Sequence, residues 1–222
     1  MREKVLQQLR GLQENEYAAF QRKLLPELPP ESILGVRAPA LRKLAGTLTE
    51  DDFSGDRYQF FEEKLLRAYH IAREKDFDRC IAKVEAFLPF VDNWAVCDQL
   101  RPPVFRQEKE RLLPYLKRWL DSGKTYPCRF AIVMLMVHYL REDFRPEYPD
   151  WVGGIRSEEY YVNMAVAWYF ATALCYRWEE TLPFLEERRL SPWVHNKAIQ
   201  KARESRMISA EKKEFLQKMK RL

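Results

Sequence analysis

Apolar residues recur at spacings of three, four and seven along most of the chain, and short breaks that contain proline, glycine or capping residues separate these segments. A repeat close to 3.6 residues is typical of amphipathic helices that bury one face. The pattern therefore predicts an all-α protein with about ten to twelve helices. The predicted helical segments in the first half are 1–25, with one or two helices, 39–47, a helix start at 49–52, 57–74, 77–89 and a helix beginning at Asp92 or Asn93. Those that follow are 105–120, with several short helices, 128–140, 157–176 with Ser157 as its cap, 181–190, 192–205 and 209–221.

Two breaks between the predicted helices stand out. The first is the turn-rich segment 26–30, and the second is a loop over 143–156 that is rich in proline, glycine and aromatic residues. The other connections are short, and short connections favour antiparallel packing of neighbouring helices. A succession of such pairs makes either a layered solenoid or a compact bundle, and the sequence shows no sharp internal repeat to choose between them. We expect one domain over residues 1–222.

The longest apolar run extends from Phe130 to Leu140 and contains His138. A membrane span needs about twenty apolar residues, so this shorter run predicts a buried core helix and no membrane partner. The start of the chain, Met1 to Lys4, opens an amphipathic helix and lacks the apolar region of a signal peptide. This favours a cytoplasmic location.

The charges of the chain are unevenly distributed. The sequence has 38 lysines and arginines against 33 aspartates and glutamates, a net charge of +5. Between Lys197 and Arg221 there are nine basic and three acidic residues, an excess of six. This excess predicts a positive face that could meet a polyanion, although a solubilising helix face explains the same charges.

Several common catalytic patterns are missing from the sequence. It has no glycine-rich phosphate-binding loop, no His-Glu-x-x-His, no Gly-x-Ser-x-Gly and no Glu-x-x-His, which argues against nucleotide hydrolysis and metalloprotease chemistry. The cysteines and histidines are widely spaced in apolar surroundings, which favours structural roles over a disulfide framework, a metal site or a catalytic base. They are Cys80, Cys97, Cys128, Cys175, His70, His138 and His195.

The segment from Val91 to Leu100 is the first candidate site. It places Trp94 and Asp98 at positions i and i+4, on one face of the predicted helix. Aspartate is a poor residue for a helix interior, so it usually has a specific partner or task there. Asp98 is therefore either a functional carboxylate beside an indole or the acceptor of a structural hydrogen bond.

The segment from Tyr160 to Tyr169 is the second candidate site. Small residues, including Ala165 and Ala167, surround Trp168 and would let another backbone or a ligand approach its ring. A helix tryptophan is nevertheless often a core residue, so a packing role is the alternative.

Four stretches of the chain, in order, resemble the DNA alkylation repair proteins of the AlkD type. The phrase 35–45, Gly-Val-Arg-Ala-Pro-Ala-Leu-Arg-Lys-Leu-Ala, is similar to their early motif. Trp94 and Asp98 resemble the family's tryptophan and catalytic aspartate, 129–132 resembles its Arg-x-Ala-Ile helix start, and Trp168 resembles its second active-site tryptophan. The resemblance implies a right-handed superhelix of antiparallel HEAT-like helix pairs, an α-solenoid, whose concave surface holds duplex DNA. It also implies a DNA glycosylase that removes cationic N3- and N7-alkylated purines without a cofactor.

The candidate residues suit this chemistry. An alkylated purine that already carries a positive charge leaves as a neutral base and needs no general acid, so one carboxylate suffices. Asp98 would stabilise the oxocarbenium character that develops on the sugar as the glycosidic bond stretches. Trp94 and Trp168 would present their rings to the cationic nucleotide, each contact contributing roughly 0.5–2 kcal/mol.

The remaining expectations concern the DNA itself. Arg129, Lys197, Lys201 and Arg203 would contact phosphates and fix the register of an alkylated duplex. No lysine is obviously placed for Schiff-base chemistry, which predicts a monofunctional glycosylase. We expect a monomer.

The sequence departs from the family pattern in one place. Members commonly carry an arginine one turn after the second tryptophan, where this chain has Ala171. The acidic pairs 179–180 and 186–187 lie near the same region and weaken the attraction to DNA, and Tyr17 and Phe20 either obstruct or shape the cleft. Two alternatives therefore accompany the glycosylase hypothesis: a non-catalytic module that binds duplex DNA, and a helical-repeat scaffold that binds a protein through exposed aromatic residues.

Overall fold

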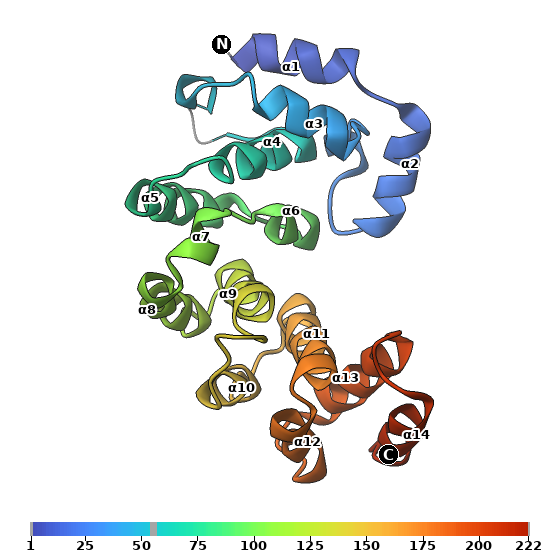
Figure 1. Cartoon of the computed structure of the whole chain (residues 1–222). Coiled ribbons are helices and arrows are strands. Elements are labelled where there is room, and N and C mark those ends of the chain that lie inside the picture. Colours follow the sequence, from blue (N-terminus) through green and yellow to red (C-terminus); the bar gives the residue numbers. More distant parts are fainter. Residues whose placement is uncertain (1, 54–56, 222) are drawn as a thin grey trace. The chain divides into compact units, whose positions relative to one another are not determined.

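A computed structural model describes residues 2–53 and 57–221 of the protein. Within these ranges the secondary structure consists of fourteen α-helices and three short 3-10 turns, and no strand occurs (Figure 1). The all-α prediction is therefore confirmed. The chain contacts group into two compact units, Met1–Glu108 and Lys109–Leu222, which we describe one at a time.

Unit 1 contains seven helices and all three 3-10 turns. They are α1 (Arg2–Gly11), α2 (Asn15–Leu24), η1 (Pro30–Ser32), α3 (Ala38–Ala45), η2 (Glu50–Phe53), α4 (Phe61–Ile71), α5 (Phe77–Phe87), η3 (Leu88–Phe90), α6 (Trp94–Gln99) and α7 (Val104–Gln107). Helix α4 is the centre of the unit, since it packs against α3, α5 and α6.

Helices α4 and α6 run in the same direction. Lys64 near the start of α4 forms an ion pair with Asp92 just before α6. The hydroxyl of Tyr69, near the end of α4, donates to Oε1 of Gln99 at the end of α6 over 3.2 Å. This parallel arrangement brings the C-terminal ends of two helices from different parts of the sequence together.

The segment 35–45 begins with the loop before α3, and Gly35 anchors this loop. Gly35 has a φ of +84°, a left-handed conformation that glycine adopts without strain. Its N–H and those of its two neighbours donate to the carboxyl group of the fully buried Glu62 on α4. A Cβ atom on Gly35 would lie 2.5 Å from the backbone nitrogen of Ala18 and closer still to the carbonyl oxygen of Glu14, so α2 packs directly on this glycine.

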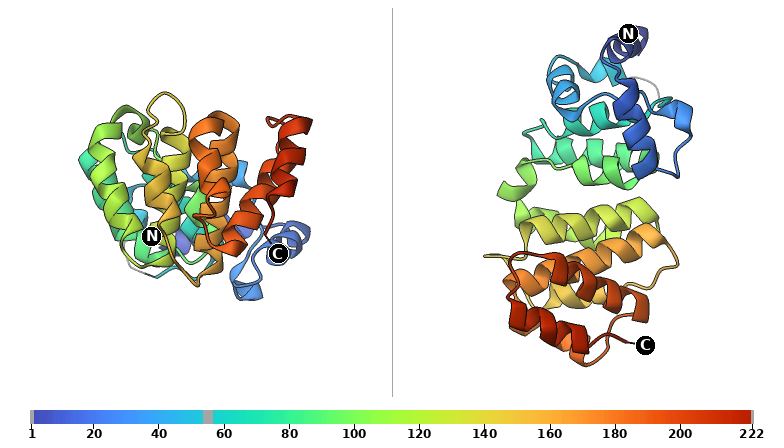
Figure 2. Two further views of the ribbon diagram at one scale, coloured as in Figure 1. Left: turned by 90° about the horizontal axis from the view of Figure 1, so that it is seen from below. Right: turned by 90° about the vertical axis from the view of Figure 1, so that its right-hand side faces the viewer.

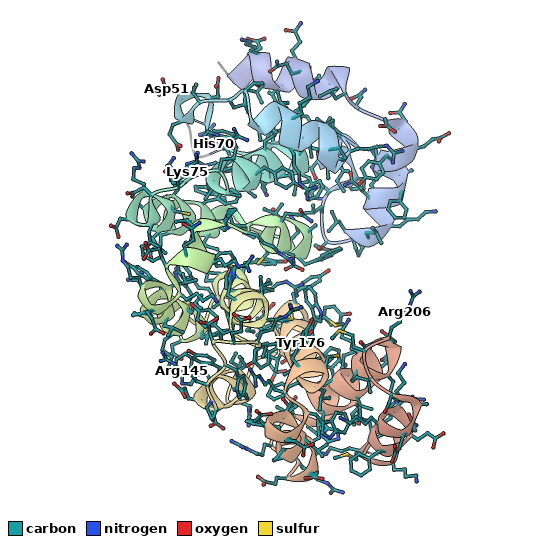
Figure 3. All side chains as sticks on the ribbon, in the orientation of Figure 1. Asp51, His70, Lys75, Arg145, Tyr176 and Arg206 are labelled. Atoms are coloured by element: carbon teal, nitrogen blue, oxygen red, sulfur yellow. The ribbon has the colours of Figure 1, made fainter. Side chains whose placement is uncertain are left out.

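A charged network joins η2, α4 and α5 on another side of unit 1. Glu50 pairs with Arg67, with Lys83 at 3.1 Å and with His70 at 3.4 Å, and Lys83 also pairs with Glu74 at 2.9 Å (Figure 3, where His70 is labelled). Burial opposes ionisation of Glu50, but Arg67 and Lys83 outweigh it and lower the pKa of Glu50 to about 2. The hydrogen bond from Lys83 is the main reason that the pKa of Glu74 also falls to about 2.

Unit 2 contains the other seven helices. They are α8 (Lys109–Leu120), α9 (Thr125–His138), α10 (Glu147–Gly153), α11 (Tyr160–Tyr176), α12 (Trp178–Glu186), α13 (Pro192–Glu204) and α14 (Ala210–Lys218). Helices α8 and α9 form an antiparallel pair, because the hydroxyl of Tyr139 after α9 donates to the carbonyl of Lys109 at the start of α8. Helix α9 is almost wholly buried, as predicted from its continuous apolar run.

Helices α9, α11 and α13 form a row in which all three run in the same direction. The ring of Tyr126 at the start of α9 lies 6.4 Å from that of Tyr161, and Tyr160 lies 5.7 Å from Trp193 at the start of α13. At the other end of the row, the sulfur of Cys175 on α11 lies 3.4 Å from the hydroxyl of Ser205 just after α13. Both views of Figure 2 show α11 and α13 side by side.

The end of the described chain is held against α13. The Nε2 atom of the buried His195 lies 2.9 Å from the carbonyl oxygen of Met219, and Asn196 exchanges two hydrogen bonds with the backbone of Arg221. Burial lowers the pKa of His195, so the ring is neutral at pH 7 and Nε2 donates its proton to Met219.

The structure differs from the sequence prediction in three details. The helix count exceeds the predicted ten to twelve, and the additional elements include the seven-residue helix α10. The predicted loop over 143–156 contains α10. Helix α11 is capped at Glu159 and not at Ser157, whose hydroxyl instead accepts a hydrogen bond from the backbone N–H of Glu159.

Candidate functional site

Helix α6 positions the first pair of candidate residues. The fully buried Asn93 caps its N-terminus, where the side-chain oxygen accepts the N–H of Val96 over 2.9 Å. The prediction that Asp92 or Asn93 begins this helix is thus confirmed. Trp94 and Asp98 follow at one-turn spacing on the same short helix.

Asp98 lies in the last turn of α6, since the helix ends at Gln99, and not in a helix interior as the sequence suggested. The negative end of a helix dipole is not a favourable position for a carboxylate. Asp98 is 8% exposed and engaged by its surroundings, yet it lines a cavity of about 470 Å³ in unit 1. It is therefore covered by protein but reachable from this cavity.

The cavity that Asp98 lines is rich in hydrogen-bond donors. Its other lining residues are Arg42, Tyr69, Ala72, Arg73, Gln99, Arg101 and Pro103. With three guanidinium groups against one carboxylate, the lining has an excess of positive charge. Burial raises the pKa of Tyr69, so its hydroxyl stays protonated and serves as a donor.

Trp94 is half-buried and fixed by its indole N–H, which donates to the carbonyl oxygen of Leu24 at the end of α2 over 3.3 Å. This bond sets the plane of the ring relative to α2. Tyr17 and Phe20, which the sequence placed near the cleft, lie on the same helix. Tyr17 is half-buried beneath the guanidinium of Arg37, which lies 4.7 Å from the ring centre, and Phe20 is exposed.

The row of parallel helices in unit 2 positions Trp168. Trp168 is half-buried on α11, eight residues after Tyr160, and Lys201 lies eight residues after Trp193 on α13. Because Tyr160 contacts Trp193 and both helices rise by the same length per residue, Trp168 lies level with Lys201. Lys197 and Lys201 are one turn apart on α13.

The other predicted DNA contacts are arranged differently. Arg129 is 4% exposed and donates to the carbonyl of Tyr161 over 2.8 Å, so a direct phosphate contact would require its side chain to turn out of this position. Arg203 is exposed but lies two residues after Lys201 and therefore on another side of α13. Ala171 is buried, so the position of the family arginine contributes no charge to the surface here.

Sequence reasoning identified the acidic residue of the unit 1 cavity but missed its basic ones. Arg42, Arg73 and Arg101 come from the end of α3, the segment after α4 and the segment after α6. Only the spacing of Asp98 and Arg101 gave a local signal. The approach of the other two arginines depends on the packing of α3, α4 and α6, which the sequence pattern does not specify.

Comparison with known protein families supports the resemblance found in the sequence. The model of one protein family, described as DNA alkylation repair enzyme, matches residues 5–202. The chain belongs to the DNA alkylation repair enzyme family. A search of curated proteins found no match.

Two further observations apply to the described residues of this family member. In residues 2–53 and 57–221, no group of three or more histidine, cysteine, aspartate or glutamate side chains is arranged to hold a metal ion. None of the helices in these ranges is both long and apolar enough to cross a membrane.

Proposed function

We propose that this protein is a monofunctional DNA glycosylase that hydrolyses the N-glycosidic bond of cationic N3- and N7-alkylated purines in duplex DNA. The observation that carries the proposal is the position of Asp98, a covered carboxylate on the wall of a cavity lined by three arginines. Membership of the DNA alkylation repair family supports it. No cofactor takes part in the proposed reaction.

Asp98 would act on the charge that develops in the transition state. As the bond to the alkylated base stretches, the sugar gains positive charge, and an anionic carboxylate fixed by the fold stabilises it without reorganising. The same oxygen atoms can orient the water molecule that adds to the sugar.

Trp94 would contribute an aromatic face to the cationic nucleotide, and its hydrogen bond to Leu24 holds the ring ready for this contact. In unit 2 the proposal assigns Trp168 an aromatic contact with the DNA. It assigns the phosphate contacts to Arg129, Lys197, Lys201 and Arg203, of which Lys197 and Lys201 lie one turn apart on α13.

The experiment that tests the proposal measures free methylated purine released from alkylated duplex DNA. Asp98→Asn keeps the shape of the side chain but removes its charge, and it should slow release at least about 100-fold. The matched control is Asp92→Asn, the same chemical change at an exposed residue just before α6. It should leave release unchanged, and circular dichroism should show both variants folded.

The possible results separate the three hypotheses. Release that continues unchanged in Asp98→Asn removes this residue from the mechanism. A wild-type protein that binds duplex DNA in a salt-sensitive way but releases no base is a non-catalytic binding module. Absence of any DNA affinity at low salt favours the protein-binding scaffold.

The lysines of α13 have their own test within the proposal. Replacing Lys197 and Lys201 with glutamine should weaken duplex binding and reduce the slope of log K against log salt by up to about 0.9 for each phosphate that the protein no longer neutralises. Lys117→Gln is the control, because Lys117 already pairs with Asp121 one turn later. An equal effect of the control would mean that the slope reports net charge and not specific contacts.

A further inference from the structure

The cavity beside Asp98 has more positive charge than its surroundings neutralise. The ion pairs in the described part of the chain leave Arg42, Arg73 and Arg101 without a carboxylate partner. The nearby network of Glu50 and Glu74, by contrast, neutralises its cations with carboxylates at 2.9–3.1 Å. Three guanidinium groups gathered around one cavity repel one another unless an anion joins them.

Two of these arginines are held in place by contacts that use only a few of their N–H donors. The guanidinium of Arg42 lies 5.0 Å from the ring centre of Tyr69 and donates one N–H to Oε1 of Gln99 over 3.0 Å. Nε of Arg101 donates to the backbone carbonyl of Asp98 over 2.7 Å. Since a guanidinium group has five N–H donors, both retain donors for a ligand.

Arg73 and Gln99 complete the donor set. A Cβ atom on Gly46, at the end of α3, would lie 3.5 Å from Nη1 of Arg73, an ordinary van der Waals distance, so this guanidinium lies beside the helix end. Oε1 of Gln99 accepts from both Arg42 and Tyr69. This arrangement directs the amide oxygen of Gln99 to these two donors and leaves its amide nitrogen as a further donor.

We infer that this cavity binds one phosphate group of the DNA backbone, held by Arg42, Arg73 and Arg101 next to the carboxylate of Asp98. Guanidinium groups match the oxygen atoms of a phosphate through paired hydrogen bonds. A cavity of about 470 Å³ is within the range of small-ligand sites, so it accepts a phosphodiester together with part of its sugar. The inference rests on the proposed function, because it assumes that duplex DNA is the substrate.

The proximity of the anion-binding arginines to Asp98 has a mechanistic meaning. A phosphate held on the arginine side of the cavity fixes the backbone, and with it the distance between the adjoining sugar and the carboxylate. Asp98 repels the phosphate, but the three positive charges of the lining exceed its single negative charge. These arginines are thus positioning residues for the sugar and not catalytic residues.

The test combines binding at several salt concentrations with a scan of the DNA backbone. The variant with Arg42, Arg73 and Arg101 all changed to glutamine should bind undamaged duplex about tenfold or more weakly at low salt. Its slope of log K against log salt should fall by about 0.9, the value for one phosphate. Arg79→Gln is the matched control, since Arg79 is 71% exposed and already pairs with Glu74.

The backbone scan replaces single phosphates around an alkylated base with neutral methylphosphonates. One position should weaken binding of the wild-type protein, and the same replacement should have no added effect on the triple variant. Arg73→Gln alone, at an exposed side chain, is the second variant if the triple variant fails to fold. A wild-type scan with no sensitive position, or an equal effect on both proteins, overturns the inference.

The results also separate this inference from the proposed function. Asp98→Asn should slow base release at least about 100-fold without reducing the salt slope. Base release by the wild type together with an unchanged slope in the triple variant would refute the phosphate site and leave the glycosylase standing. If the wild type releases no base and the triple variant still shows a reduced slope, the glycosylase proposal is refuted and the phosphate site stands. If the triple variant loses binding to an acidic protein but binds DNA as the wild type does, the DNA phosphate is refuted as the occupant of the cavity.

Discussion

The close approach of α2 to Gly35 gives the sharpest prediction of stability. Gly35→Ala introduces a methyl group that would overlap the backbone at Glu14 and Ala18, at a residue whose φ is +84°. The left-handed conformation alone costs about 1–2 kcal/mol for a residue with a Cβ atom. The loop must also shift to relieve the overlap. This shift breaks the buried hydrogen bond from Gly35 to Glu62, which costs about 1–3 kcal/mol.

The chain contains a matched control for this change. Gly123 has a φ of +67°, but a Cβ atom there would meet no atom within 4 Å. Gly123→Ala therefore adds the conformational strain without the overlap, and the reduced freedom of the unfolded chain offsets it by about 0.4–1 kcal/mol. Because the same offset applies to both changes, we expect a loss of about 1 kcal/mol for Gly123→Ala and about 3 kcal/mol for Gly35→Ala.

Urea denaturation and native-state hydrogen exchange measure both effects. A loss of about 3 kcal/mol should lower the urea midpoint by about 1–3 M for common denaturant slopes. Because the chain has two compact units, exchange of the α2 and α4 amides should accelerate in Gly35→Ala, whereas Gly123→Ala should affect the amides around α8 and α9. Equal midpoints for the two variants would refute the reasoning from close packing.

Three further predictions concern acid, helix capping and thiol reactivity. The free energy of unfolding should fall as the pH drops from about 4.5 towards 2, because Glu50 and Glu74 have folded pKa values of about 2, and Glu74→Gln should reduce this acid dependence in a denaturation series. Asn93→Ala should lower the unfolding free energy by about 1 kcal/mol in urea, whereas Asn93→Ser, which keeps a capping oxygen without adding a buried charge, should cost less. A thiol reagent should modify the half-exposed Cys175 before Cys80, whose pKa burial raises to about 12, and mass spectrometry after brief labelling would contradict this if Cys80 reacted first.

The helical architecture could be predicted because periodicity and capping are local properties. Helix α9 followed from its continuous apolar run, and Asn93 followed from its position before Trp94. Helix α10 was missed because its proline and glycine residues suggest a loop, yet Pro149 lies in the first turn, where a missing N–H breaks no helical hydrogen bond.

The candidate site could be predicted only where its residues share an element. One-turn spacing placed Trp94 beside Asp98, and the grouping of Lys197 with Lys201 has the same origin. Arg42 and Arg73 reach the cavity only because α3, α4 and α6 pack together, which the spacing of residues does not encode. Burial of Arg129 likewise depends on α11 lying against α9.

Helix α2 connects the loop at Gly35 with the indole ring of Trp94. Its first half rests on Gly35, and the carbonyl of its last residue, Leu24, holds the N–H of Trp94. A rigid helix transmits a displacement at one end to the other over about 10–15 Å, and a misplacement of about 1 Å is enough to slow an enzyme considerably. The loop at Gly35 thus influences, through α2, the orientation of the Trp94 ring.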